Sequence, residues 1–301
     1  MTSTSHRDLR HWTIALAAPA IRILPPWWKV RVYSRLTGSP FTQGGHAGKT
    51  VSTRIWPHRY RMELRLDDWM ERLAFFVGCY YEIDSTAALV KLLRPGDCFI
   101  DVGANLGFMT LTGSRAVGPD GKVMAFEPNH LLASRLNDTL LLNDIRNVTV
   151  FENALGSADG SATLSTGTHS GTANLRGTDS AGDEVRVRRG DSFITAIEKS
   201  AWVLTKIDAE GYEQRILQGF SHLISRPRTA FLIEITDRWL EELGGSSKHL
   251  FAMLSRAGFH AYLPKLSRTG KMTFVAIPSP RNEVPQYDVL FVRPGETWFS
   301  R

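Results

Sequence analysis

Cysteine is scarce in this sequence, and no apolar segment is long. The 301 residues contain two cysteines, Cys79 and Cys98, each beside apolar or aromatic residues. We therefore expect buried thiols in a reducing, cytoplasmic setting rather than a disulfide framework or a metal site. The apolar run over residues 12–20 is shorter than the roughly 20 residues that cross a bilayer. No small-residue cleavage site follows it convincingly, which argues against a secretory signal.

Residues 12–30 combine apolar residues with Trp27, Trp28 and basic neighbours. Two interpretations stay open, peripheral membrane contact through this N-terminal segment or a helix packed on the domain. Residues 34–50 are rich in Gly, Ser and Thr and predict a linker. We therefore divide the chain into an N-terminal extension and linker (1–50), a cap region (51–93) and a main domain (94–301).

Acidic residues are fewer than basic ones, with 30 Asp and Glu against 36 Lys and Arg. The resulting net charge of +6 is partly local, in residues 54–65 and 185–189. No aromatic-and-basic RNA-binding motif accompanies these stretches, so no nucleic-acid partner is expected.

The most informative stretch, residues 99–108, reads FIDVGANLGF and predicts a strand, a glycine loop and a helix start. Gly103 and Gly107 allow a sharp turn and close approach of a ligand. Glu127 ends the next predicted strand, about 20 residues on, where nucleoside-binding folds hold ribose hydroxyls. The G-x-G-x-x-G spacing of dinucleotide binders is missing. The pattern D-x-G-x-N-x-G followed by E-P favours S-adenosylmethionine instead.

Apolar strands alternate with helical patterns along the rest of the chain. Residues 122–126, 148–151, 203–207 and 229–235 read as further strands, which predicts an α/β fold with a parallel sheet and right-handed crossovers. Residues 160–189 are β-prone and rich in Gly, Ser and Thr. They predict a strand-rich insertion, followed by a helix capped by Asp191 or Ser192.

Together with AFEPN, ALGSADG and KIDAEGYEQRILQG, these motifs resemble the FkbM family of S-adenosylmethionine-dependent methyltransferases over about residues 81–294. The resemblance implies a Rossmann-like class I methyltransferase sheet, mostly parallel, whose antiparallel last strand is residues 288–292. S-adenosyl-L-methionine is then the cofactor. The predicted cofactor-binding residues are Asp101, Gly103, Asn105, Gly107, Glu127, Asn153, Ala154 and Asp208.

Three charged residues, Lys206, Asp208 and Glu210, end the predicted strand 203–207. In open α/β sheets a ligand lies outside such strand ends, so Asp208 or Glu210 is the candidate catalytic base, with Lys206 orienting it. A salt-bridge network is the structural alternative. A divalent metal held by Asp208 and Glu210 lacks an evident third ligand, so no metal is predicted.

Candidate acceptor contacts come from three places. The resemblance implies Tyr81 and Glu82 near the cofactor end, and Glu234 interrupts an otherwise apolar strand. The insertion offers His169, Ser170 and Asn174, because loop-side insertions commonly carry specificity.

The predicted function is methylation of a hydroxyl on a small metabolite, sugar or glycolipid, with a small-molecule or glycan acceptor as partner. Two alternatives stay open. One is an NAD-dependent oxidoreductase or nucleotide-sugar-modifying enzyme, against which the missing third glycine and the lack of a Tyr-x-x-x-Lys pair argue. The other is a non-catalytic binding module on the same fold.

Overall fold

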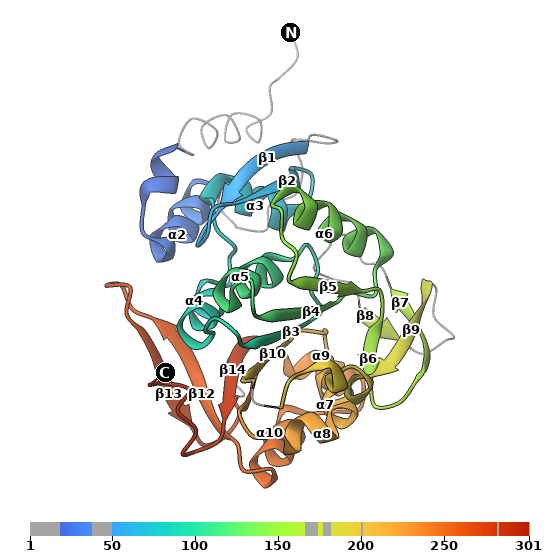
Figure 1. Ribbon diagram of the computed structural model, residues 1–301. Coiled ribbons are helices and arrows are strands. Elements are labelled where there is room, and N and C mark those ends of the chain that lie inside the picture. The colour runs from blue at the N-terminus through green and yellow to red at the C-terminus, as the bar shows by residue number, and fades with distance from the viewer. Residues whose placement is uncertain are drawn as a thin grey trace.

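The fold is built on one central sheet with helices on both faces, a cap formed by the N-terminal elements and a second, smaller sheet (Figure 1). The computed structural model describes residues 19–37, 50–165, 174–176, 182–199, 201–281 and 283–300. Within these ranges, no helix has both the length and the apolar character needed to cross a bilayer.

The central sheet has eight strands in the order β13-β12-β14-β11-β10-β3-β4-β5. Its parallel strands are β3 (Cys98–Val102), β4 (Lys122–Phe126), β5 (Val148–Phe151), β10 (Val203–Ile207) and β11 (Thr229–Ile235). Its antiparallel strands are β12 (His260–Leu266), β13 (Met272–Ile277) and β14 (Tyr287–Val292). This confirms the predicted class I methyltransferase sheet, including the antiparallel last strand.

Strand order reverses between β3 and β10. From β3 the chain builds outward through β4 and β5, whereas β10 pairs with the other side of β3 and leads to β11. The chain segments that follow β3 and β10 run in opposite directions along the sheet. They therefore leave a crevice between them at its carboxyl edge. The sequence motifs ending β3 and β10 are therefore placed side by side.

The middle strands read as continuous apolar runs because helices cover both of their faces. Phe99 of β3 packs in a core cluster with Leu89 and Met109, and its neighbour Ile100 packs in another with Ile216 and Leu250. Figure 1 shows α4 (Ile83–Leu92), α5 (Phe108–Val117) and α6 (His130–Leu142) on one side of the sheet. On the other side lie α7 (Glu213–Gly219), α8 (Ser221–Ser225) and α10 (Ser247–Arg256), with α9 (Asp237–Glu242) near the carboxyl edge.

The cap, as the name is used from here on, consists of the hairpin of β1 (Thr50–Ile55) and β2 (Tyr60–Arg65), α3 (Trp69–Val77) and residues 78–82, together with α2 (Pro26–Thr37) from the predicted N-terminal extension, which packs on α3. Every second residue of β2, beginning with Tyr60, is buried, as its alternating sequence predicts. Asp68 caps α3 by accepting the N–H groups of Met70 and Glu71, and Gly78 ends the helix in the left-handed region. The chain then turns toward the carboxyl edge of the sheet.

The predicted insertion is confirmed as a four-stranded sheet in the order β6-β9-β7-β8. Its strands are β6 (Ala154–Gly156), β7 (Gly160–Ser165), β8 (Asn174–Arg176) and β9 (Asp183–Arg189). The helix predicted after it is wrong, because the chain forms two short 3-10 turns, η1 (Gly190–Ser192) and η2 (Ile194–Ala196). Asp191 instead accepts the Ser221 hydroxyl and the His222 N–H at the start of α8.

Candidate functional site

Acidic side chains from four parallel strands surround one cavity at the strand-order reversal. Asp101 is the second-last residue of β3, Glu127 follows β4, Asp208 follows β10, and Glu234 lies near the end of β11. Other lining residues are Lys206, Glu210, Asn153, Ala154, Gly103 and Asn105. The register of β10 on β3, with Lys206 opposite Asp101, brings together two motifs far apart in sequence.

The glycine loop after β3 fits tightly against the segment after β10. Gly103 has φ of 81°, and a Cβ added there would lie 1.8 Å from the carbonyl oxygen of Asp208. Only glycine permits this approach. Gly107 also has positive φ and is the N-cap residue just before α5, but it does not line the cavity. A Cβ on Gly107 would lie 2.2 Å from Leu136 Cδ1, so Gly107 shapes the turn and its packing on α6.

Glu127 is held by backbone donors on both sides. Its Oε2 accepts the N–H of Asn105 and its Oε1 accepts the N–H of Asn129, each at 2.8 Å. Burial raises the pKa of Glu127 to about 7, and these two hydrogen bonds oppose the shift. Asp101 is also buried and accepts the Thr110 hydroxyl at 2.5 Å. Burial raises its pKa to about 6, opposed by the charge of Lys206.

Lys206 is the positive charge in a buried group of carboxylates. Its Nζ donates to Asp208 Oδ2 at 2.6 Å and lies 3.3 Å from Glu82 Oε2, while the Tyr80 hydroxyl donates to Glu82 Oε1. Burial alone would lower the pKa of Lys206, but Asp208 and Glu82 raise it well above its usual value. Lys206 is therefore a fixed cation between the cap and the sheet.

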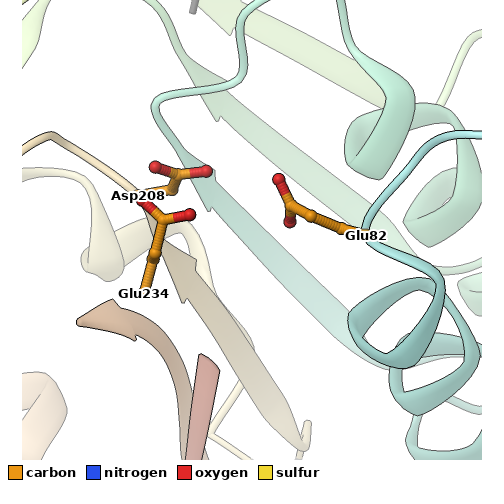
Figure 2. A group of neighbouring side chains, drawn as sticks. All are labelled: Glu82, Asp208 and Glu234. Atoms are coloured by element: carbon orange, nitrogen blue, oxygen red, sulfur yellow. The ribbon is translucent and has the colours of Figure 1, made fainter. Parts of the chain in front are cut away.

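Figure 2 shows Glu82, Asp208 and Glu234 pointing toward one another from the start of α4, the end of β10 and β11. One oxygen from each lies within 4.8 Å of the others, a spacing that also suits a metal ion. Lys206 already contacts two of the three carboxylates and supplies positive charge at this point.

Glu234 of this group and Glu210, which lines the same cavity, both have raised pKa values. The Glu234 carboxylate accepts a hydrogen bond from Gln286, and burial, together with the charge of Asp208, raises its pKa well above the usual value. Glu210 has φ of 47°, a strained conformation for a residue with a side chain. Burial, and then the charge of Asp208, raises the pKa of Glu210 to about 9.

A second cavity of about 810 Å³ adjoins the first on the side of the cap and β14. The two share Tyr81, Glu234, Trp239 and Gln286 as lining residues. The second cavity, here named the outer cleft, is also lined by Trp69, Glu82, Asp84, Ser85, Lys265, Arg281, Tyr287 and Asp288, among others. An aromatic and carboxylate-lined space therefore continues outward from Asp208 and Glu234.

Most of the predicted site residues gather around these two cavities. Tyr81, Glu82 and Glu234 line the outer cleft, and Asn153 and Ala154 line the inner cavity beyond Glu127. His169 and Ser170 lie outside the described residues. Asn174 begins β8, and its side chain is outside the described part of the structure.

The sequence interpretation missed Tyr80, Trp239, Gln286 and Asp288. Asp288 had a detectable signal, because it is an acid at the start of the apolar strand β14, as Glu234 is within β11. No sequence pattern marks Gln286 or Trp239 as a site residue, because a loop glutamine and a helical tryptophan each occur in many surroundings.

Comparison with curated proteins gives no match. Among solved structures, the chain is similar to the precorrin-6y C5,15-methyltransferase of Geobacter metallireducens, with 13% identity, TM-score 0.41, and coverage of 71% of this chain and 89% of that chain. It is also similar to a putative methyltransferase from Streptococcus mutans in complex with S-adenosylhomocysteine, with 12% identity, TM-score 0.41, and coverage of 69% and 94%. A S-adenosylmethionine-dependent O-methyltransferase from Thermotoga maritima has 14% identity, TM-score 0.37, and coverage of 71% and 65%.

A family model gives the assignment that these distant structures do not. The model described as the methyltransferase FkbM domain matches residues 101–261, more than half of the chain. The match begins at Asp101 and includes Glu127, Lys206, Asp208 and Glu234. It confirms the resemblance found in the sequence motifs, and the chain belongs to the FkbM methyltransferase family.

Proposed function

We propose that this methyltransferase transfers a methyl group to a hydroxyl of a small metabolite, sugar or glycolipid. One observation carries the proposal. The Lys206–Asp208 pair lines the inner cavity and lies directly beside Glu82 and Glu234, two carboxylates that line the outer cleft. A donor in the first space and an acceptor in the second would meet at this pair.

The inner cavity fits S-adenosylmethionine, which is the cofactor. Glu127 and Asp101 are carboxylates that keep acceptor capacity beyond the hydrogen bonds already made, as ribose hydroxyls and an ammonium group require. Asn153 and Ala154 line the same cavity. We assign the adenine to these two residues. When bound, the cofactor supplies an electrophilic methyl group on a sulfonium.

Asp208 is the better candidate base of the two predicted carboxylates. A hydroxyl acceptor must lose a proton. Asp208 uses Oδ2 for Lys206, and among the described residues no donor bonds to its Oδ1. Lys206 fixes the orientation of Asp208 and is a positioning residue. Burial, and then the charge of Asp208, raises the pKa of Glu210 to about 9, which favours Asp208 over Glu210 as the base at neutral pH. A positioned base typically contributes about 10²- to 10⁴-fold in rate.

The outer cleft favours an acceptor with both hydroxyls and apolar C–H surface. Trp69, Tyr81 and Trp239 supply aromatic surface, and Glu82 and Glu234 supply carboxylates beside them. A sugar ring presents hydroxyls along its edge and C–H groups on its faces, and it suits such a lining. This supports a glycosyl or polyol group within the wider class of acceptors.

Calorimetry with S-adenosylhomocysteine tests the cofactor half of the proposal. We expect the wild-type chain to bind and Glu127→Gln to weaken binding about 10- to 100-fold, the loss of a hydrogen bond to a charged group. Glu152→Gln, an exposed carboxylate after β5, is the matched control. A thermal shift with NAD and none with S-adenosylhomocysteine would instead favour the oxidoreductase alternative.

The acceptor half is tested by mass spectrometry of cell extract incubated with the enzyme and S-adenosylmethionine. We expect hydroxylated compounds to gain one methyl group. Asp208→Asn should lower turnover by about 10²-fold or more while binding S-adenosylhomocysteine nearly as tightly. Methylation confined to nitrogen or carbon atoms would contradict the O-methyl assignment.

A further inference from the structure

The cap carries an exposed face that has no role in the proposed reaction. On α2, Trp28, Arg31 and Arg35 follow the i, i+3, i+7 spacing that places residues on one side of a helix, and all three are exposed. Leu36 at the end of α2 is 37% exposed, and Ile23 just before the helix is 86% exposed. These five residues are called the α2 face.

The opposite side of this segment is firmly anchored. Tyr33 is 1% exposed and stacks on Phe76 of α3, with ring centroids 6.1 Å apart. Arg22 donates to the Thr53 hydroxyl and to the backbone oxygen of Phe75. Ile21 is buried in the same small core. The α2 face is therefore presented outward by a packed element, and Figure 1 shows α2 at the edge of the molecule beside α3.

Charge in this segment has one sign. Residues 19–37 contain four basic residues and no acidic residue. Exposed tryptophan and branched apolar side chains beside arginines are the composition of helices that lie in a membrane interface, where the aromatic ring sits at headgroup level and arginine meets anionic headgroups. A nucleic acid would complement the arginines but not Ile23, Trp28 and Leu36.

We propose that the α2 face docks on an anionic lipid surface and holds the enzyme peripherally at a membrane. The apolar residues enter the interface, and Arg31 and Arg35 contact headgroup phosphates. Since the face lies on the cap and not at the carboxyl edge of the sheet, docking does not require the cofactor.

Co-sedimentation of the full-length chain with vesicles tests this proposal. We expect binding to phosphatidylcholine vesicles that contain phosphatidylserine and weak binding to phosphatidylcholine alone. The double variant Arg31→Gln/Arg35→Gln should lower the partition coefficient about tenfold or more, given the usual contribution of each basic residue near an anionic surface. Trp28→Ser should also weaken binding.

Matched control variants distinguish vesicle binding through the α2 face from nonspecific binding through other exposed apolar or basic residues. Leu141→Ser changes an apolar residue that is 80% exposed on α6, and Arg146→Gln changes an exposed arginine outside the cap. Both should bind vesicles as the wild type does, and all variants should keep the circular dichroism spectrum and S-adenosylhomocysteine affinity of the wild type.

Three results would overturn the proposal. The first is a wild-type chain that stays in the supernatant with both vesicle types. The second is an equal loss of binding in the control variants. The third is full vesicle binding by Trp28→Ser combined with competition by RNA, which would identify a polyanion site instead.

Discussion

Replacement of Lys206 by methionine is the sharpest test of the buried charge group. The Lys206 ammonium lies 2.6 Å from Asp208 Oδ2 and 3.3 Å from Glu82 Oε2. The exposed fraction is 3% for the Lys206 side chain, 20% for Asp208 and 7% for Glu82. Solvent therefore screens these contacts weakly. Methionine keeps an unbranched side chain that is one atom shorter, and it removes the ammonium with its charge and its hydrogen-bond donors.

Breaking a buried ion pair from one side costs about 3–5 kcal/mol, because the remaining charge is left without compensation. Asp208 is partly exposed and can relax toward water, so we expect the lower end, about 3 kcal/mol. At roughly 2 °C per kcal/mol for a chain of this size, the melting temperature falls by about 6 °C.

The pH dependence of this loss has a definite sign. Burial raises the pKa of Glu82 in the folded state, and Lys206 is the charge that opposes the rise. A carboxyl with a raised folded pKa destabilises the fold increasingly as pH rises from its unfolded pKa to its folded pKa. Without Lys206 that pKa rises further, so the variant loses more stability at pH 8 than at pH 6.

Urea unfolding followed by circular dichroism at both pH values measures the free energy of unfolding. Lys248→Met, at an exposed position on α10, is the control and should change stability by less than about 0.5 kcal/mol. Equal stability of the Lys206 variant and wild type at pH 8 would refute the reasoning. So would a deficit that grows on acidification.

Three further predictions concern the inner cavity. Gly103→Ala should lower S-adenosylhomocysteine affinity at least tenfold by calorimetry, since its Cβ would meet Asp208, whereas Gly96→Ala, with similar φ and open space, should keep the affinity. Methyl transfer should continue in excess chelator because Lys206 supplies the cation among the carboxylates, and loss of activity restored by Mg²⁺ would contradict this. Glu210→Gln, which mimics the protonated acid, should keep turnover within a few-fold at pH 7 and diverge from wild type only near or above pH 9.

Much of the central sheet could be predicted because its strands are buried on both faces. Val203–Ile207 and Thr229–Ile235 are apolar runs of strand length, and such runs mark parallel strands covered by helices. The glycine loop could also be predicted from the local sequence, because Gly103 and Glu127 have a fixed spacing within one βαβ unit. Local chemistry therefore predicts which end of the sheet holds the cofactor.

Contacts between residues that are far apart in the sequence could not be predicted in this way. The sequence predicts Asp191 or Ser192 as a helix cap. The Asp191 carboxylate instead accepts hydrogen bonds from Ser221 and His222 of α8, which the local sequence does not reveal. Glu82 was a candidate from family resemblance only, and its contact with Lys206 exists because the cap folds over the sheet edge. Trp239 likewise reaches both cavities only through the placement of α9.

The family match covers the proposed cofactor end of the site but only a small part of the outer cleft. Residues 101–261 contain the glycine loop, Glu127 and Asp208, which form the proposed cofactor end. Much of the outer cleft comes from outside that range, with Tyr81 and Glu82 before it and Gln286 and Asp288 after it. Lys206 joins the two parts, because its ammonium contacts Asp208 within the match and Glu82 beyond it. On the proposed function, we expect changes at flanking residues that line the outer cleft alone, such as Arg281 and Tyr287, to alter acceptor choice more than binding of the methyl donor.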